Sequence, residues 1–181
     1  MLRDFKYSKM NMCMEKMCEK KNSLHEFYEL KVKDIMLTPK SDLPCVTEKA
    51  DIVAVLSLLI EKDHVWVMDS TDPVQLLGVI TESDTLVLLS PPLTSLQIFD
   101  KPDSRSLQFG ESLLAEEITS KKPITTSPDE TIRDVVMKMK EQKIKHLPVV
   151  DESQQLIGEI TLSRLIQEYV NQHIDFVKDE T

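Results

Sequence analysis

The sequence is poor in glycine and in aromatic residues. Its 181 residues include three glycines, and aromatic side chains make up 5%. So few glycines can hardly build the glycine-rich loops with which many enzymes hold phosphates. The motifs GxxxxGK[ST], GxGxxG, GxSxG and HExxH are all absent from the chain. We therefore expect a protein that is not an enzyme.

Long apolar runs and cysteine pairs are also missing. No apolar run approaches the length of a membrane-spanning helix, and the N-terminus lacks the apolar core of a secretory signal. The cysteines, Cys13, Cys18 and Cys45, form no CxxC pair. Their spacing predicts reduced thiols in a cytoplasmic protein, with Cys45 as a buried core thiol.

Basic charge is scarce outside the N-terminus. The net charge is −9, and residues 1–31 hold seven of the 22 basic residues against five of the 31 acidic ones. An acidic surface argues against binding to nucleic acid or to an anionic membrane. A nucleic-acid regulator that acts through the basic N-terminal segment is therefore the weakest hypothesis. The four histidines are scattered and provide no metal-ligand set.

The chain contains an internal repeat. "LLGVITESD" at 76–84 matches "LIGEITLSR" at 156–164, and "HVWVMD" at 64–69 matches "HLPVVD" at 146–151. Further upstream, "DIVAVLSLLIEK" (51–62) matches "TIRDVVMKMKEQ" (131–142), and "VKDIM" (32–36) matches "AEEIT" (115–119). Matching segments in the same order and register predict two copies of one structural unit.

Each copy predicts the same elements. A short extended piece with Thr and Val comes first, and "PDET" before the second helix places proline and acids in its first turn. Apolar runs at 65–68 and 147–150 predict buried strands, followed by second strands at 76–81 and 156–161. Helical spacing is shared by Ile52, Val55, Leu56 and Leu59, and by Ile132, Val135, Val136 and Met139. The closing helix of the second copy is amphipathic, with Leu165, Ile166, Tyr169, Val170 and Phe176 on one face.

The predicted fold class is α+β, with two β-α-β-β-α repeats. The domains are a helical extension at 1–30, a first repeat at 31–90, a linker at 91–112 and a second repeat at 113–177. In the extension, an apolar stripe could pack on the module, on a dimer mate or on a separate partner: Met10, Cys13, Met14, Met17 and Cys18.

These residues resemble the CBS domain family. The resemblance rests on "VKDIM", on "HLPVVD" before the hairpin and on "GxITxSD" before the last helix, and it covers about 31–177. It implies a tandem pair, or Bateman module, packed about a pseudo-two-fold axis with two clefts for AMP, ADP, ATP or S-adenosylmethionine. Such pairs usually dimerise and regulate an effector protein. The chain departs from the family at Trp66, usually Pro, and at Arg164, usually Asp.

Thr81 and Asp84 are the leading ligand candidates. Where a strand ends and a helix begins, a hydroxyl and unpaired N–H groups favour a phosphate, and a carboxylate can accept both ribose hydroxyls. Strand residues could supply an adenine slot, and the "KH" before the "LPVVD" strand could reach a phosphate. The predicted ligand-binding residues are Val65, Val67, Ile80, Thr81, Ser83, Asp84, Thr126, Lys145, His146, Thr161, Ser163 and Arg164.

Simpler interpretations remain open. Thr81 and Asp84 also fit a capping box, which is compatible with ligand binding. Arg164, at the matching place in the second copy, opposes the positive end of a helix, so we expect it to serve another purpose. The second cleft has lost ribose recognition, or Arg164 faces ligand phosphates, or it faces solvent. We expect one adenosine site at Thr81 and Asp84, and an altered one at Thr161 and Arg164.

The leading functional hypothesis is a stand-alone regulatory protein that binds an adenine nucleotide or S-adenosylmethionine and signals its status to a partner. No catalytic cofactor is expected. A homodimer is expected, and an effector protein is possible. The alternative is a structural or interaction subunit with degenerate clefts and no ligand.

Overall fold

The computed structural model describes residues 24–38, 43–90 and 113–178, without the side chains beyond residue 172. The predicted Met/Cys stripe and the predicted linker at 91–112 lie outside the described residues. The chain divides into two compact units. Unit 1 consists of Met1–Met36, Thr126–Val149 and Glu159–Thr181, and unit 2 consists of Leu37–Thr125 and Val150–Gly158.

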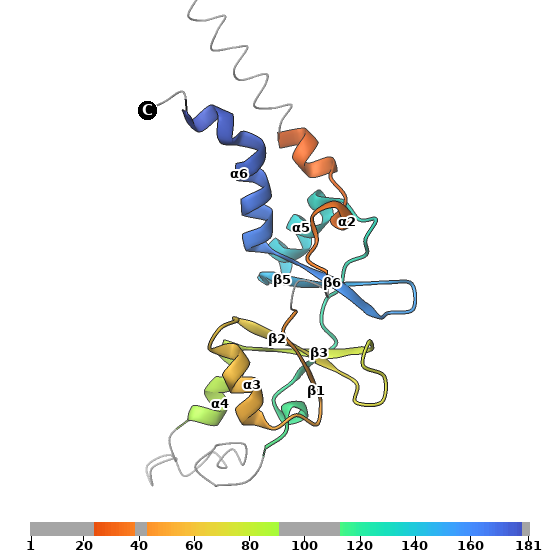
Figure 1. Ribbon diagram of the computed structural model, residues 1–181, viewed down its shortest axis with the longest axis vertical. Helices are drawn as coiled ribbons and strands as arrows, with labels where there is room; N and C mark the ends of the chain where they lie inside the picture. The colour runs from red at the N-terminus through yellow and green to blue at the C-terminus, as the bar shows by residue number, and fades with distance from the viewer. Residues whose placement is uncertain (1–23, 39–42, 91–112, 179–181) are drawn as a thin grey trace, which may run out of the picture. The chain divides into compact units, whose positions relative to one another are not determined.

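Unit 2 is built on a four-stranded sheet. Its order is β1 (Cys45–Thr47), β2 (His64–Met68), β3 (Leu76–Thr81) and β4 (Ser120–Lys121). β1 runs parallel to β2, and the other pairs are antiparallel. Helices α3 (Ile52–Leu59) and α4 (Leu86–Leu89) lie side by side on one face of this sheet (Figure 1). The predicted apolar runs and helical spacing are confirmed here.

The core of unit 2 fills the space between the sheet and these helices. Val55 of α3, Val65 and Val67 of β2 and Ile80 of β3 are fully buried in one cluster. Cys45 is exposed, so its prediction as a core thiol was wrong. The reason is the alternation of side chains along β1, which is exposed at Cys45 and Thr47 and partly buried at Val46.

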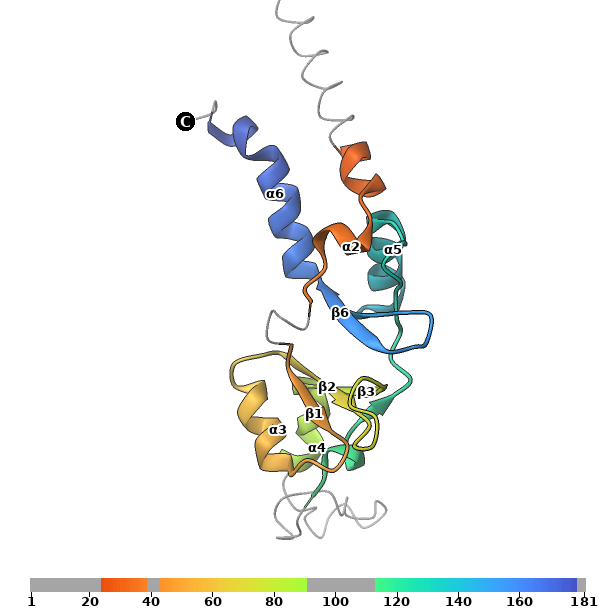
Figure 2. The same ribbon diagram turned by 45° about the vertical axis from the view of Figure 1, so that its right-hand side comes forward.

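Unit 1 combines a hairpin with several helices, including a helical segment at residues 24–29. The hairpin strands are β5 (His146–Val150) and β6 (Leu156–Thr161), and the other helices are α2 (Val32–Ile35), α5 (Ile132–Gln142) and α6 (Leu162–Lys178). Figure 2 shows α2 between α5 and α6. Val32, Ile132, Leu147 and Ile160 are fully buried. The strands at 147–150 and 156–161 are therefore confirmed.

Helix α5 begins later than "PDET" suggested. Thr131 is its N-cap, with its hydroxyl bonded to both the N–H and the carboxylate of Asp134. The proline and the acids of "PDET" thus precede the helix, and Asp134 supplies the negative charge of the first turn.

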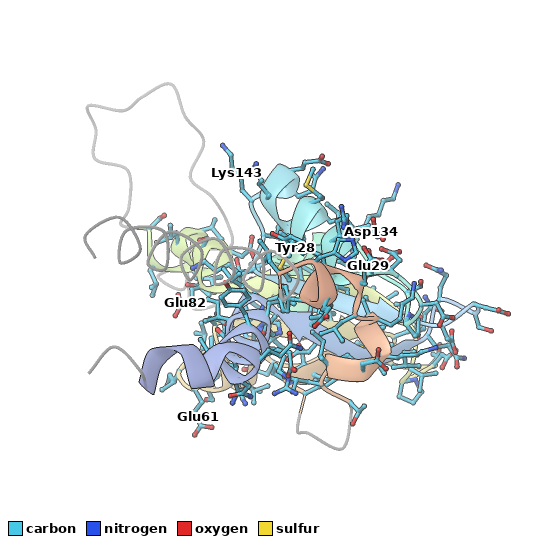
Figure 3. The ribbon with its side chains drawn as sticks, turned by 90° about the horizontal axis from the view of Figure 1, so that it is seen from above. Tyr28, Glu29, Glu61, Glu82, Asp134 and Lys143 are labelled. Carbon is cyan, nitrogen blue, oxygen red and sulfur yellow. The ribbon has the colours of Figure 1, made fainter. Side chains whose placement is uncertain are left out.

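On the same helix, Arg133 donates to Glu29 at 3.0 Å and lies over the ring of Tyr28. Figure 3 shows Tyr28 and Glu29 near Asp134.

The apolar face of α6 is only partly covered. Leu165 is buried, and Tyr169 meets Phe27 edge-on with 5.5 Å between the ring centroids. Ile166, Tyr169 and Val170, however, are 56%, 40% and 46% exposed. The side chain of Phe176 lies outside the described residues. The amphipathic face is present, but three of its four described residues are exposed.

The compact units do not coincide with the sequence repeats. In unit 1, the N–H groups of Val32 and Lys33 from the first repeat donate to carbonyls just before α5 of the second. In unit 2, Ala115 and Glu116 from the second repeat donate to Ala50 and Glu48, just before α3 of the first. The leading segments are therefore exchanged between the repeats, which repeat-by-repeat prediction did not anticipate.

Trp66 and Pro148 explain a difference between the repeats. The N–H of Trp66 donates to the carbonyl of Pro44 at 2.7 Å and helps β1 to pair with β2. Proline has no N–H, and in the second repeat the corresponding contact is a single bridge between Thr126 and Val149. The tryptophan side chain is buried beside Met68 and Leu156.

Candidate functional site

The turn after β3 gathers three polar side chains. Oδ2 of Asp84 accepts from the N–H and the hydroxyl of Thr81, both at 2.8 Å. Its Oδ1 accepts from the Ser120 hydroxyl at a longer 3.2 Å. Asp84 is half-buried and follows the strand in a short 3₁₀ helix, Glu82–Thr85. The predicted pairing of Thr81 with Asp84 is present, and Ser120 joins it from β4.

The glycine in β3 makes this arrangement possible. A Cβ on Gly78 would lie 2.3 Å from Cγ2 of Thr119 and 2.7 Å from the carbonyl oxygen of Ser120. β4 pairs with β3 through Gly78 and Val79, and this pairing carries Ser120 to Asp84. Gly78 is needed here because the backbone of β4 approaches so closely, and not for its dihedral freedom.

The matching turn of the second repeat is built differently. Oγ1 of Thr161 accepts from the N–H of Arg164 at 3.1 Å. The guanidinium of Arg164 donates to the carbonyl of Ile35 at 3.0 Å and to Gln167 at 3.1 Å, and it lies 3.7 Å from Glu168. Ile35 ends α2, and a cation suits the unpaired carbonyls of a helix end. Arg164 therefore ties α6 to α2.

The strand residues predicted to form an adenine slot lie in the core of unit 2. Val65, Val67 and Ile80 are all fully buried. Val67 also lines a cavity of about 180 Å³, with Leu77, Thr119 and Lys121 around it. Two carboxylates, Glu48 and Glu116, complete that lining.

Glu48 is held as an anion beside this cavity. Its two carboxylate oxygens accept from the N–H and the hydroxyl of Ser70, each at 2.7 Å. The Ser70 hydroxyl, more than any other group, holds the pKa of Glu48 below its usual range. In the neighbouring turn, the Thr71 hydroxyl likewise lowers the pKa of Asp69. The lining of this cavity therefore includes a stable carboxylate charge, together with Lys121.

The remaining predicted site residues divide between the units. Ser83 is exposed in unit 2, and Lys145 and Ser163 are exposed in unit 1. His146 is partly buried. Thr126 is buried and donates to Glu130 at 3.0 Å, which in turn binds Lys138. The structure thus brings Thr81 to Asp84 and Thr161 to Arg164, and it gives Thr126 a protein partner.

Sequence analysis missed Ser120. Its side chain bonds Asp84, although 36 residues separate the two. A signal existed, because Ser120 directly follows "AEEIT", the segment that matches "VKDIM". Only the pairing of β4 with β3 shows which carboxylate it reaches.

A second cavity in unit 2 was also missed. It measures about 440 Å³ and lies between the start of β3, the chain after β4 and the tip of the β5–β6 hairpin. Lys121, Lys122 and Gln154 contribute to its lining.

None of the helices in the described part of the chain has the length and apolar character needed to span a membrane.

Comparison with known proteins agrees with this architecture. The chain is 29% identical over 153 residues to the uncharacterized protein MJ1426 of Methanocaldococcus jannaschii, covering 75% of this chain and 89% of that protein. It is 28% identical over 141 residues to a homoserine O-acetyltransferase of Methanohalobium evestigatum, covering 76% of this chain but only 24% of the enzyme.

Two solved structures share the fold. One is CBSX2 in complex with AMP, with a TM-score of 0.62 and 23% identity, covering 78% of this chain and 96% of that one. The other is the CBS domain pair of MJ0100 in complex with 5-methylthioadenosine and S-adenosyl-L-methionine. Its TM-score is 0.59 at 23% identity, and the match covers 79% of this chain and 98% of that one. The family model of the CBS domain matches residues 32–90 and 115–171. The chain therefore belongs to the CBS domain family and contains two CBS domains in tandem.

Proposed function

We propose that this CBS pair is a regulatory module that binds an adenosine-containing ligand at Thr81, Ser83 and Asp84. The observation that carries the proposal is the state of the Asp84 carboxylate. Oδ2 is fixed by two short hydrogen bonds, whereas among the described residues Oδ1 accepts one longer bond, from Ser120. A carboxylate oxygen offers about two acceptor positions, so an oriented Oδ1 has room for a ribose hydroxyl.

The ligand classes we propose are adenine nucleotides and S-adenosylmethionine. The support is the fold shared with CBSX2, described with AMP, and with the MJ0100 pair, described with S-adenosyl-L-methionine. The second turn supports one competent site, because Arg164 is bound to the protein itself and offers no carboxylate for a ribose. Binding would act on a partner only through different affinities for different conformations of the module.

Calorimetric titration of the full chain with AMP, ATP and S-adenosylmethionine tests the proposal. We expect one site per chain, and we expect Asp84→Ala to weaken binding at least about 10-fold through loss of a charged hydrogen bond. Asp134→Ala is the matched control, since Asp134 accepts from the N–H and hydroxyl of Thr131 in the same local arrangement on α5. Binding of none of the three ligands would leave the interaction-subunit alternative.

We also propose that the chain forms a homodimer through α6. The exposed apolar residues on one side of this helix support the proposal: Leu162, Ile166, Tyr169 and Val170. A surface of this kind is favourable to bury against a second copy. Ile166→Glu should give a monomer in sedimentation velocity, while Gln167→Glu, a charge change one residue away, should leave the dimer intact. A wild-type monomer would refute this part of the proposal.

The domain boundaries at 31–90 and 113–177 are likewise proposed. They are supported by the two matches to the CBS family model, at 32–90 and 115–171. The extension at 1–30 and the linker at 91–112 complete the proposed organisation.

A further inference from the structure

The described charged residues that line the 440 Å³ cavity of unit 2 are both lysines. Among the described residues, its lining includes two lysines, Lys121 and Lys122, and two glutamines, Gln75 and Gln154, but no Asp or Glu. The other described lining residues are Thr125 and a set of apolar residues that includes Leu76 and Val150. Small-molecule sites of this size typically combine an apolar wall with a few convergent polar groups. This cavity has that composition, with a net positive charge.

Lys122 takes an unusual backbone conformation beside this cavity. Its φ is 62°, in the left-handed region that non-glycine residues rarely adopt. Along an extended strand, consecutive side chains point to opposite faces. The left-handed residue interrupts that alternation directly after β4, and Lys121 and Lys122 both line the cavity. Strained residues cluster at functional sites, so the conformation of Lys122 makes this cavity a candidate binding site.

The positive charges of this cavity are not neutralised within the described chain. Among the described residues, neither Lys121 nor Lys122 has a carboxylate oxygen within ion-pair distance. Asp151, near the hairpin tip, turns Oδ1 to the N–H groups of Ser153 and Gln155 in its own turn. Lys121 also lines the smaller cavity with Glu48 and Glu116, so Lys122 is the lysine that belongs to the larger cavity alone.

The cavity is separate from the Asp84 turn. Ser120 and Lys121 are neighbours in β4 and point to opposite faces of the sheet. Ser120 reaches Asp84, whereas Lys121 lines the cavities. We propose that this cavity is a second binding site, for a small organic dianion with an apolar body, such as a phosphate monoester. The two ammonium groups match a compact double charge, and the apolar wall matches the body.

The test is a titration of the isotope-labelled full chain with phenyl phosphate, followed by the amide NMR signals of unit 2. We expect saturable shifts at Lys122, Gln75 and Gln154. Lys122→Gly should weaken binding about 5-fold or more, since it removes one ammonium group from the site. Glycine accepts the left-handed conformation without strain, so this variant should fold at least as well as the wild type.

Lys143→Gly is the matched control. Lys143 is also a left-handed lysine, with φ of 56° at the end of α5, and it points away from the rest of unit 1 (Figure 3). Its replacement removes the same charge from a residue that does not line the cavity, and it should change the affinity less than about 2-fold in salt. Equal losses in both variants would mean nonspecific attraction and would overturn the proposal.

Two further comparisons separate this site from the proposed adenosine site. Inorganic phosphate should bind more weakly than phenyl phosphate, and equal affinities would overturn the role of the apolar wall. Asp84→Ala should leave the phenyl phosphate shifts at Lys122 unchanged. Phenyl phosphate shifts confined to Thr81 and Asp84, or no saturable shift at all, would refute the second site without bearing on AMP binding.

Discussion

The strand-to-helix turns of the two repeats begin alike and are stabilised by opposite charges. In the first, Asp84 reaches back to Thr81 and receives Ser120 from β4. In the second, Arg164 reaches across to the carbonyl of Ile35 and along α6 to Glu168. The first turn keeps a carboxylate oriented at a strand end, and the second uses the same position to hold two helices together.

This difference follows from what each unit places beside the turn. β4 brings a hydroxyl to Asp84, which suits a carboxylate acceptor. The C-terminal end of α2 brings a carbonyl to Arg164, which suits a cationic donor. Repeats with the same sequence pattern can therefore stabilise corresponding turns with side chains of opposite charge.

The largest effect should come from Gly78→Ala. The added methyl group would collide with Thr119 and with the backbone of Ser120, and displacing β4 should destabilise unit 2 by about 1–3 kcal/mol. Chemical denaturation measures the loss. Ser120→Ala, which keeps the β4 backbone, should cost less. Unchanged stability of Gly78→Ala would show that β4 does not depend on close approach to β3.

The second largest effect should come from Arg164→Ala. It removes the hydrogen bond to Ile35 and should destabilise unit 1 by about 1–2 kcal/mol. Arg164→Lys should recover part of the loss, because lysine keeps the positive charge. The recovery should be incomplete, since a single ammonium group replaces the fork of guanidinium N–H donors. AMP affinity, measured by calorimetry, should stay unchanged. A stable variant that has lost AMP binding would instead place Arg164 at a ligand phosphate.

The two threonines should respond unequally. Thr161 caps α6 by accepting from the Arg164 N–H, and Thr161→Ala should cost about 1 kcal/mol. The Thr81 hydroxyl donates to a carboxylate that the Thr81 N–H still holds, so Thr81→Ala should cost less stability but weaken AMP binding more. Thermal denaturation and calorimetry measure the two effects. Equal changes in both variants would remove the distinction between the turns.

The smallest effect should be the pH dependence of the Lys33–Asp129 pair in unit 1. The partners lie 2.8 Å apart and are 53% and 80% exposed. Lys33 lowers the pKa of Asp129, and Asp129 raises the pKa of Lys33. The stabilisation from Asp129 is present above its unfolded pKa and is lost as pH falls through its lower folded pKa. The contribution from Lys33 is present below its unfolded pKa and is lost as pH rises through its higher folded pKa.

Lys33→Met should therefore flatten the stability profile at both ends. Denaturation midpoints at acidic, neutral and alkaline pH measure the change. An identical pH profile in Lys33→Met would show that solvent screens this exposed pair completely.

Local sequence determined much of this protein. The apolar runs specified β2 and β5, and the helical spacing specified α3 and α5, because burial of one face is encoded in the order of neighbouring residues. The Thr81–Asp84 pairing was also predictable, since a capping box spans only four residues. Cys45 was mispredicted because a three-residue strand shows too little alternation to reveal its buried face.

Tertiary structure decided what the two turns do. Ser120 meets Asp84, and Arg164 meets Ile35, across 36 and 129 residues of sequence. Both meetings depend on the exchange of leading segments between the repeats, which brings β4 to unit 2 and α2 to unit 1. The same exchange places Lys121 and Lys122 beside the tip of a distant hairpin. Sequence periodicity records which side of an element is buried but not which partner covers it, so these contacts appear only in the folded chain.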